Sequence, residues 1–251
     1  MERPHDSAAT SPRQTPAPSQ NQAQTLADLA ATLDHTLLRR EASSEELERL
    51  CRDALHYGFR GVCAFPEHLP RVVSLLAGRV PAVSVVGFPG GLEPLKLKAW
   101  QAREAVAAGA AEIDAVLDRE ALRQRRLGHV LDEVARLVEA AYPARLKAIL
   151  ETGDLTSQER IMAATLAKAG GAAFVKTSTG VLHAGATVED VALLRQVVGR
   201  DMGVKASGGI RDLGQCLAML RAGADVVGTS ASVAIMEQAL AHPASLAGGW
   251  K

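Results

Sequence analysis

The chain has 251 residues, 47% of them hydrophobic, which suffices for one large core, although two small domains are an alternative. Its 28 Lys and Arg residues balance 28 Asp and Glu residues, so no broad basic surface exists to attract nucleic acid or an anionic membrane. No segment approaches the ~20 apolar residues of a membrane span. The three cysteines lack CxxC spacing and favour a reducing compartment, so we expect a cytoplasmic protein.

The first 24 residues are rich in Pro, Ser, Ala and Gln and carry almost no large apolar side chains. They also lack the apolar centre of a secretory signal. Such a segment cannot bury enough surface to offset its ordering entropy. We therefore predict a disordered tail over residues 1–24 and a single domain over residues 25–251.

From Thr25 onward, helical and strand-like segments alternate. LADLAATLDH predicts a helix that runs into a short strand at 33–36, and SSEELERLCRDALHYG predicts a helix between a serine cap and Gly58. Seven further strands are expected at 61–65, 82–88, 111–117, 145–151, 172–177, 202–207 and 224–230. Apolar residues at three- and four-residue spacing predict helices at 97–109, 127–142, 158–170, 187–199 and 213–223.

Eight strands that alternate with helices predict a (β/α)8 TIM barrel. A doubly wound open sheet is the alternative, but no GxGxxG follows the first strand. A repeated pattern supports the barrel: four segments end a helix in glycine and then enter a strand. The residues five positions after these glycines are Cys63, Asp114, Lys176 and Gly228. We expect these four residues near the carboxyl ends of their strands. The alternative is that the repeat has no further meaning, because Gly-Ala is common where helices end.

Two lysines occupy similar contexts in neighbouring predicted strands, Lys176 in FVKTSTG and Lys205 in GVKASGG. Adjacent strands lie about 4.8 Å apart, so inward-pointing lysines at matching levels would face each other. Like charge and desolvation together depress the pKa of one ammonium group and create an amine nucleophile suited to Schiff-base formation. The alternative for a single lysine is a structural ion pair or a side chain whose ammonium reaches solvent.

Asp114 and two glycine-rich turns complete the candidate site. Within EIDAVL, an unpaired Asp114 carboxylate would be costly, so it needs a cation or a proton-transfer role, such as bonding Lys205. The turns SGGI (207–210) and GTSAS (228–232) each precede a helical segment and predict a phosphate site built from backbone amides. Arg211 adds a cation there or is simply solvated.

Other polar residues carry weaker predictions. The seven histidines show no HxH or HExxH spacing, so we expect no metal site, and His35 is expected to help fix the first strand. Glu151, at a strand end, contacts the cleft lysines or forms an ordinary ion pair. Cys63 is expected to be a small buried residue.

The segments DHTLL, VVGFP, EID, ILETG, FVKTSTG, VKASGGIR and GTS, in this order, closely resemble the deoxyribose-phosphate aldolase family from about Leu29 to Met236. This resemblance implies a class I aldolase with a (β/α)8 fold. It further implies reversible cleavage of 2-deoxy-D-ribose 5-phosphate into D-glyceraldehyde 3-phosphate and acetaldehyde in deoxynucleoside breakdown. Phosphosugar and aldehyde substrates are implied, with no metal or organic cofactor and with a homodimer as the expected assembly.

The resemblance also assigns roles by motif. Lys176 is similar to the Schiff-base lysine, Lys205 to the neighbour that perturbs its pKa, and Asp114 to the proton-relay acid. Residues matching the phosphate-gripping loops are Gly180, Gly208, Gly209, Arg211, Gly228 and Ser230, and positions expected to line the cleft are Asp34, Cys63 and Thr177.

The chain departs from the family pattern at four places. Arg39-Arg40 follows DHTLL where many relatives have Lys-Pro, and GFPGGLEP replaces a more usual turn. Ala231 stands where a second serine is frequent, and the C-terminal SLAGGWK lacks a terminal tyrosine. We expect these differences to affect phosphate affinity and rate.

Two other functions are compatible with the motifs. One is a Schiff-base aldolase acting on another sugar, and the other is a catalytically silent phosphosugar-binding barrel. The intact lysine pair disfavours the silent barrel.

Overall fold

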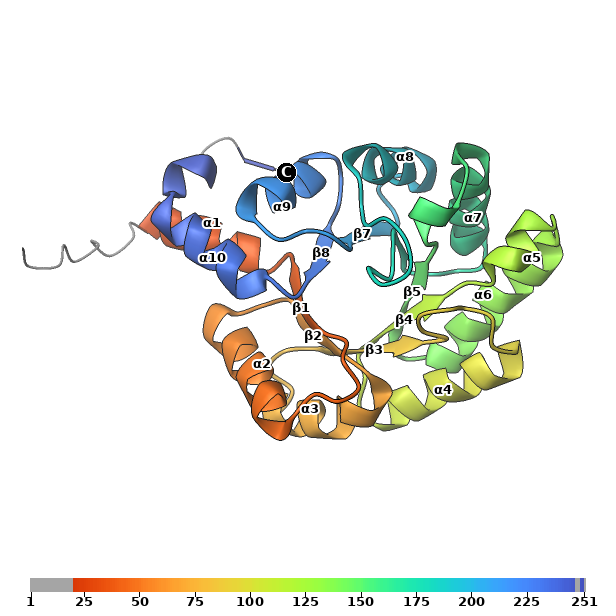
Figure 1. Ribbon diagram of the computed structural model, residues 1–251, viewed down its shortest axis with the longest axis horizontal. Helices are drawn as coiled ribbons and strands as arrows, with labels where there is room; N and C mark the ends of the chain where they lie inside the picture. Colours follow the sequence, from red (N-terminus) through yellow and green to blue (C-terminus); the bar gives the residue numbers. More distant parts are fainter. Residues whose placement is uncertain (1–19, 247–248, 251) are drawn as a thin grey trace, which may run out of the picture.

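The computed structural model describes residues 20–246, 249 and 250, with side chains described from Gln24 onward. Eight parallel strands form a closed barrel in chain order, and β8 pairs back with β1 (Figure 1). The predicted (β/α)8 barrel is confirmed, and each predicted strand overlaps an observed one. The strands are β1 (Leu33–Leu37), β2 (Gly61–Ala64), β3 (Ala82–Val86), β4 (Glu112–Val116), β5 (Arg145–Ile149), β6 (Phe174–Lys176), β7 (Gly203–Ser207) and β8 (Val226–Thr229).

Helices surround the barrel in Figure 1, and α1 packs against α10. They are α1 (Gln20–Ala30), α2 (Ser44–Tyr57), α3 (Leu69–Leu76), α4 (Leu95–Ala107), α5 (Arg119–Arg123), α6 (Leu127–Ala141), α7 (Ser157–Ala169), α8 (Val188–Val198), α9 (Leu213–Arg221) and α10 (Ser232–Ala241). The short α3 and α5 were not predicted, because one or two turns give little periodicity to detect. No helix in the described ranges is long and apolar enough to cross a membrane.

The predicted tail, residues 1–24, lies mostly outside the described residues. α1 nevertheless begins at Gln20, so the chain is helical before the predicted boundary. Gln and Ala are good helix formers, and the buried side chains of Leu26 and Leu29 join the main core. Composition did not reveal that α1 begins at Gln20, because the apolar residues that stabilise this helix lie in its second half.

Local signals explain several element boundaries. Ser43 and Glu46 form a capping box at the start of α2, and Gly58 ends that helix with φ 69°. Thr156 and Glu159 form the equivalent box at α7. The two capping boxes satisfy backbone amides that a helix leaves unpaired and fix where each helix begins.

The barrel interior is divided into an apolar half and a charged half. Outward-facing strand residues such as Ile113 and Ala115 belong to the main core beneath the helices. Facing inward, Cys63, Phe65, Val83, Val85, Phe88, Val116 and Ile149 form a separate apolar cluster. Val85 of β3 pairs in register with Asp114 of β4, so an apolar wall borders the charged side chains of β4 to β7.

Candidate active site

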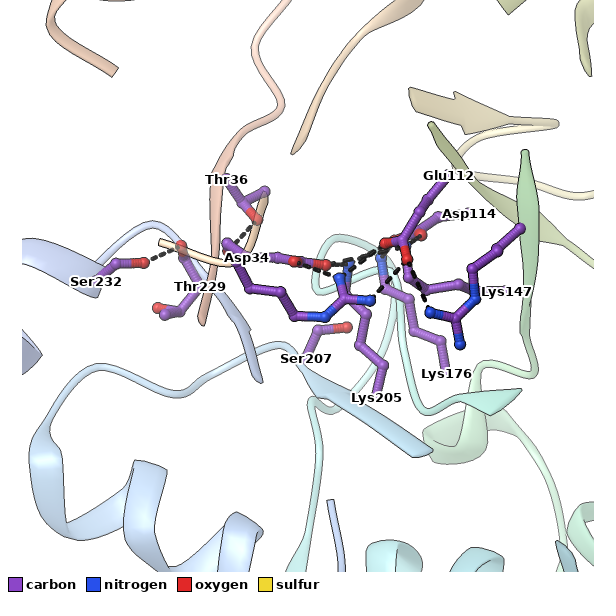
Figure 2. A network of polar contacts seen from close by, with 12 residues as sticks. Asp34, Thr36, Glu112, Asp114, Lys147, Lys176, Lys205, Ser207, Thr229 and Ser232 are labelled. Atoms are coloured by element: carbon purple, nitrogen blue, oxygen red, sulfur yellow. Dashed lines mark hydrogen bonds and ion pairs between the residues drawn. The ribbon is translucent and has the colours of Figure 1, made fainter. Parts of the chain in front are cut away.

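Three lysines from successive strands converge on the carboxylate of Asp114 (Figure 2). Lys147 Nζ of β5 lies 2.8 Å from Asp114 Oδ1, whereas Lys176 Nζ of β6 and Lys205 Nζ of β7 lie 2.9 and 2.8 Å from Oδ2. All four side chains are buried. The site is therefore an ion cluster centred on one carboxylate and enclosed by the barrel.

Lys176 and Lys205 are directly paired in the β6–β7 register, as their matching sequence contexts predict. Their ammonium groups do not simply face each other, however, because both bond the same oxygen of Asp114. The two cations are therefore coupled through a shared anion.

A further set of ion pairs extends the cluster around the barrel. Asp34 lies 2.6 Å from Lys205 and 2.9 Å from Arg60. Arg60 lies 2.6 Å from Glu112, which in turn lies 2.6 Å from Lys147. Each cation of this cluster pairs with at least one carboxylate, so burial of the charges is compensated by ion pairing and hydrogen bonding.

Our sequence reasoning missed Lys147, Glu112 and Arg60. A sequence signal for Lys147 and Glu112 does exist. EID carries two acidic residues at alternate positions and RLK carries two basic ones, and alternate residues of a strand share one face. Asp114 and Lys147 pair in register between β4 and β5. Arg60 precedes β2, and nothing in its local sequence reveals that its side chain turns toward the barrel interior.

The cluster fixes which groups carry charge. Burial alone would raise the pKa of Asp114, but Lys147, Lys176 and Lys205 hold it well below its ordinary value. Burial is likewise overcome at Asp34, whose pKa falls to about 2 beside Lys205, Lys147 and Arg60. Burial would lower the pKa of Lys205, yet Asp114 and Asp34 raise it above its ordinary value. Lys205 is thus a fixed cation.

A cavity of about 360 Å³ opens above this cluster, and Lys176 is the one barrel lysine that lines it. The other lining residues come from β1, from the ends of β7 and β8, and from the loops after β1, β6, β7 and β8. They are Thr36, Leu37, Leu38, Arg39, Thr179, Gly180, Val181, Ser207, Gly208, Gly209, Ile210, Arg211, Gly228, Thr229 and Ser230. The arrangement joins one lysine side chain to a compartment lined in part by glycine-rich loops.

The glycine-rich loops offer unused backbone donors. In the described part of the chain, the amides of Gly180, Gly208, Gly209 and Ser230 donate to no protein acceptor. Gly180 and Gly208 pack so closely that a Cβ on Gly208 would lie 3.0 Å from the Gly180 Cα. Free amides from three loops, next to the guanidinium of Arg211, are suited to an anionic group.

The predicted site residues fall into two layers. The six residues expected to grip phosphate all line the cavity with Lys176. Asp114, Lys205 and Asp34 lie beneath it within the ion cluster and do not line it. The remaining predicted cleft positions, Cys63 and Thr177, are fully buried and do not line the cavity.

Thr177 and Cys63 therefore have other roles than lining the cleft. The Thr177 hydroxyl contacts the carbonyl oxygen of Ser207 at 3.2 Å, which ties β6 to β7. Burial raises the pKa of the Cys63 thiol to about 11, which leaves it a neutral packing group at neutral pH.

The departures in sequence have local explanations at two places. Arg39 lines the cavity and pairs with Glu46, while Arg40 lies 2.7 Å from Glu67. In GFPGG, Gly91 has φ 76°, and a Cβ there would lie 2.6 Å from the carbonyl oxygen of Leu117. The turn therefore needs glycine to pack against the end of β4.

Glu151 matches neither prediction made for it. Its Oε2 accepts a hydrogen bond from the Thr179 amide at 3.1 Å, and among the described residues it forms no ion pair and touches no lysine ammonium. The side chain instead turns toward the loop after β6. Sequence reasoning placed the residue correctly at a strand end but could not give the direction of its side chain.

Comparison with known proteins places this geometry in a family. Residues 29–237 match the family described as DeoC/LacD family aldolase. The sequence is 48% identical over 217 residues to deoxyribose-phosphate aldolase of Methanothermobacter thermautotrophicus, covering 85% of this chain and 96% of that protein. The corresponding enzyme of Dictyoglomus turgidum is 44% identical over 210 residues, covering 83% and 96%.

Solved structures agree with the sequence matches. A chain described as QR15, an aldolase, superposes with a TM-score of 0.83 at 35% identity, covering 87% of this chain and 99% of that one. The tetrameric deoxyribose phosphate aldolase of Aeropyrum pernix gives 0.79 at 34% identity, covering 88% and 98%. Fold, buried lysine cluster and sequence matches lead to one conclusion: the chain belongs to the DeoC/LacD aldolase family and is an aldolase.

Proposed function

We propose that this aldolase reversibly cleaves 2-deoxy-D-ribose 5-phosphate into D-glyceraldehyde 3-phosphate and acetaldehyde through a Schiff base on Lys176. The observation that carries the proposal is the contrast among the barrel lysines: Lys176 has one ionic partner and lines the cavity, whereas Lys205 has two and lies below it. The relatives that share this sequence are named for this substrate. We assign the reaction to deoxynucleoside breakdown.

The chemistry begins when the uncharged amine of Lys176 attacks the C1 aldehyde of the open-chain sugar. The carbinolamine loses water and leaves an iminium ion. The C3 hydroxyl then loses its proton, the C2–C3 bond breaks, and its electron pair moves into the iminium to form an enamine. Glyceraldehyde 3-phosphate departs, a proton adds to the enamine carbon, and water releases acetaldehyde and regenerates the amine.

Asp114 and Lys205 divide the supporting roles. Asp114 bonds Lys176, so it can receive and return protons during carbinolamine formation. Because three lysines hold the pKa of Asp114 low, a proton does not remain on it, which suits a relay. Lys205 remains protonated and bonds the same Asp114 oxygen as Lys176, which places a like charge beside the reacting amine. The free amides of the glycine loops, with Arg211 and Ser230, hold the 5-phosphate.

The test is reductive trapping. Borohydride added with acetaldehyde should leave an ethyl group on Lys176, found by peptide mass spectrometry. Absence of the label under conditions that label a known class I aldolase would overturn the Schiff-base assignment. Comparing turnover of 2-deoxyribose with that of its 5-phosphate separates the proposed substrate from an unphosphorylated sugar.

A further inference from the structure

Glu151, just after β5, combines two unfavourable features. It adopts φ 58°, a region reached by only three non-glycine residues among those described, the others being Ala77 and Arg125. Its side chain is fully buried, and its Oε1 atom has no hydrogen-bond partner within the described ranges. Strained backbone and an unpartnered buried carboxylate oxygen persist where the surrounding structure imposes them, often at functional sites.

The contacts of this residue fix the chain that follows Lys176. Glu151 Oε2 accepts from the amide of Thr179 at 3.1 Å. The next residue, Thr152, donates its amide to the carbonyl of Thr177 at 2.8 Å. The end of β5 therefore holds two peptide groups in the three residues that connect the Schiff-base lysine to Gly180.

The same segment is held from the opposite side by β7. Ser207 donates its amide to Thr177 Oγ1 at 3.1 Å and its hydroxyl to the carbonyl of Ser178 at 2.6 Å. Beyond this point, Thr179 Oγ1 accepts from the amide of Val181 at 3.2 Å. The amides of Thr179 and Val181 are thus occupied, and the amide of Gly180 between them is left without a protein acceptor beside the cavity.

We propose that Glu151 is a positioning residue for phosphate recognition: its buried carboxylate holds the Thr179 amide so that the Gly180 amide stays available to the substrate phosphate. This inference rests on the proposed function. Thr179 is buried, so removal of the acceptor leaves an amide without a partner, and the loop moves to satisfy it. Lys176 is held by Asp114 and not by Glu151, so the reacting nitrogen keeps its place.

The expected effect is selective for the phosphate end of the substrate. In Glu151→Gly, which removes the carboxylate and suits the positive φ, KM for 2-deoxyribose 5-phosphate should rise about tenfold, the size of one lost hydrogen bond to a charged group. The kcat for that substrate and kcat/KM for unphosphorylated 2-deoxyribose should change less than threefold. Glu151→Gln restores an acceptor for the Thr179 amide and should recover most of the wild-type KM.

A matched control separates phosphate recognition from release of backbone strain. Arg125 also has a positive φ, 56°, but does not line the cavity. Arg125→Gly should therefore leave kcat and KM unchanged for both substrates. If Glu151→Gly fails to fold, Glu151→Asp retracts the carboxylate, and the same rise in KM is expected. Inhibition by inorganic phosphate should weaken in parallel in the affected variant.

Three results would overturn the inference. They are an unchanged KM for 2-deoxyribose 5-phosphate in Glu151→Gly, equal losses of kcat/KM on the phosphorylated and unphosphorylated sugars, and no recovery of KM in Glu151→Gln. Failure of the proposed function is distinguishable, because it appears in the wild-type enzyme as a lack of turnover of 2-deoxyribose 5-phosphate.

Discussion

Two fully or nearly fully buried lysines in this protein have opposite surroundings. Lys98 of α4 donates to Glu133 at 2.6 Å, to the carbonyl of Val116 at 3.0 Å and to the carbonyl of Gly91. Among the described residues, Lys176 donates to Asp114 alone, and it lines a cavity. An ammonium group has three protons to donate. All three donors of Lys98 are therefore used by protein acceptors, whereas Lys176 has donors left that can bond a ligand.

The difference teaches how to separate structural from reactive lysines when both are buried. Lys98 joins the turn after β3 to α6, because Gly91 belongs to that turn and Glu133 to α6. Its three partners occupy all three ammonium protons and leave the group inaccessible. Lys176, with one partner among the described residues, lines the cavity and can reach an aldehyde. Burial alone therefore identifies neither role, whereas partner number together with cavity access does.

The largest expected effect tests this contrast at the reacting nitrogen. Lys176→Met should lower kcat by about 1,000-fold or more, since the covalent route disappears, and should abolish trapping by borohydride and acetaldehyde. Lys98→Met should keep the label on Lys176. Peptide mass spectrometry distinguishes the two, and an ethyl group on Lys98 in the wild-type protein would break the comparison.

The second effect concerns stability. Lys98→Met leaves the carboxylate of Glu133 buried without its cation, which should reduce the free energy of unfolding by about 3–5 kcal/mol. The double variant Lys98→Met with Glu133→Leu removes both charges and should regain part of that loss. Urea denaturation measures both values. A double variant no more stable than the single one would show that Lys98 acts through the carbonyls of Gly91 and Val116 rather than through Glu133.

The third prediction concerns the fixed cation next to Lys176. The raised pKa of Lys205 keeps it protonated through the neutral and mildly alkaline range. In Lys205→Leu that cation is missing, so the like charge that shares the Asp114 oxygen with Lys176 is lost. Schiff-base formation should fall about 100-fold near neutral pH and partly recover in alkali. A pH profile of trapping that matches the wild type would contradict the coupling.

The fold could be predicted from the sequence because each strand is a short apolar run between helical periodicities. Lys176, Lys205 and Asp114 stood out because charge inside such a run requires a partner. The partners themselves were less accessible. Lys147 and Glu112 were missed although EID has acidic residues, and RLK basic residues, at alternate positions. Whether these side chains meet depends on the pairing register of β4 and β5, which the sequence does not give. The Glu151 contact depends on a positive φ that no local residue pattern signals.

His35 extends the comparison to a buried group with fewer partners still, because its Nδ1 atom has no hydrogen-bond partner in the part of the chain that the structure describes. Burial lowers the pKa of His35 from 6.5 to about 4. Between these values the unfolded chain binds a proton that the folded chain does not. The free energy of unfolding should therefore fall as pH drops from 6.5 toward 4, by at most about 1.4 kcal/mol per pH unit.

Replacement of His35 by leucine should flatten this slope between pH 6.5 and 4, the range set by the shift of its pKa. The paired carboxylates contribute little at pH 6.5 and 5.5, because Asp34 and Asp114 titrate near the ordinary pKa of 3.8 in the unfolded chain and at still lower pH in the folded protein. Urea denaturation of both proteins at pH 6.5 and 5.5 measures the change. An equal slope in the variant would mean that a buried group without a partner at Nδ1 does not control acid stability here, and that partner number matters only for the lysines.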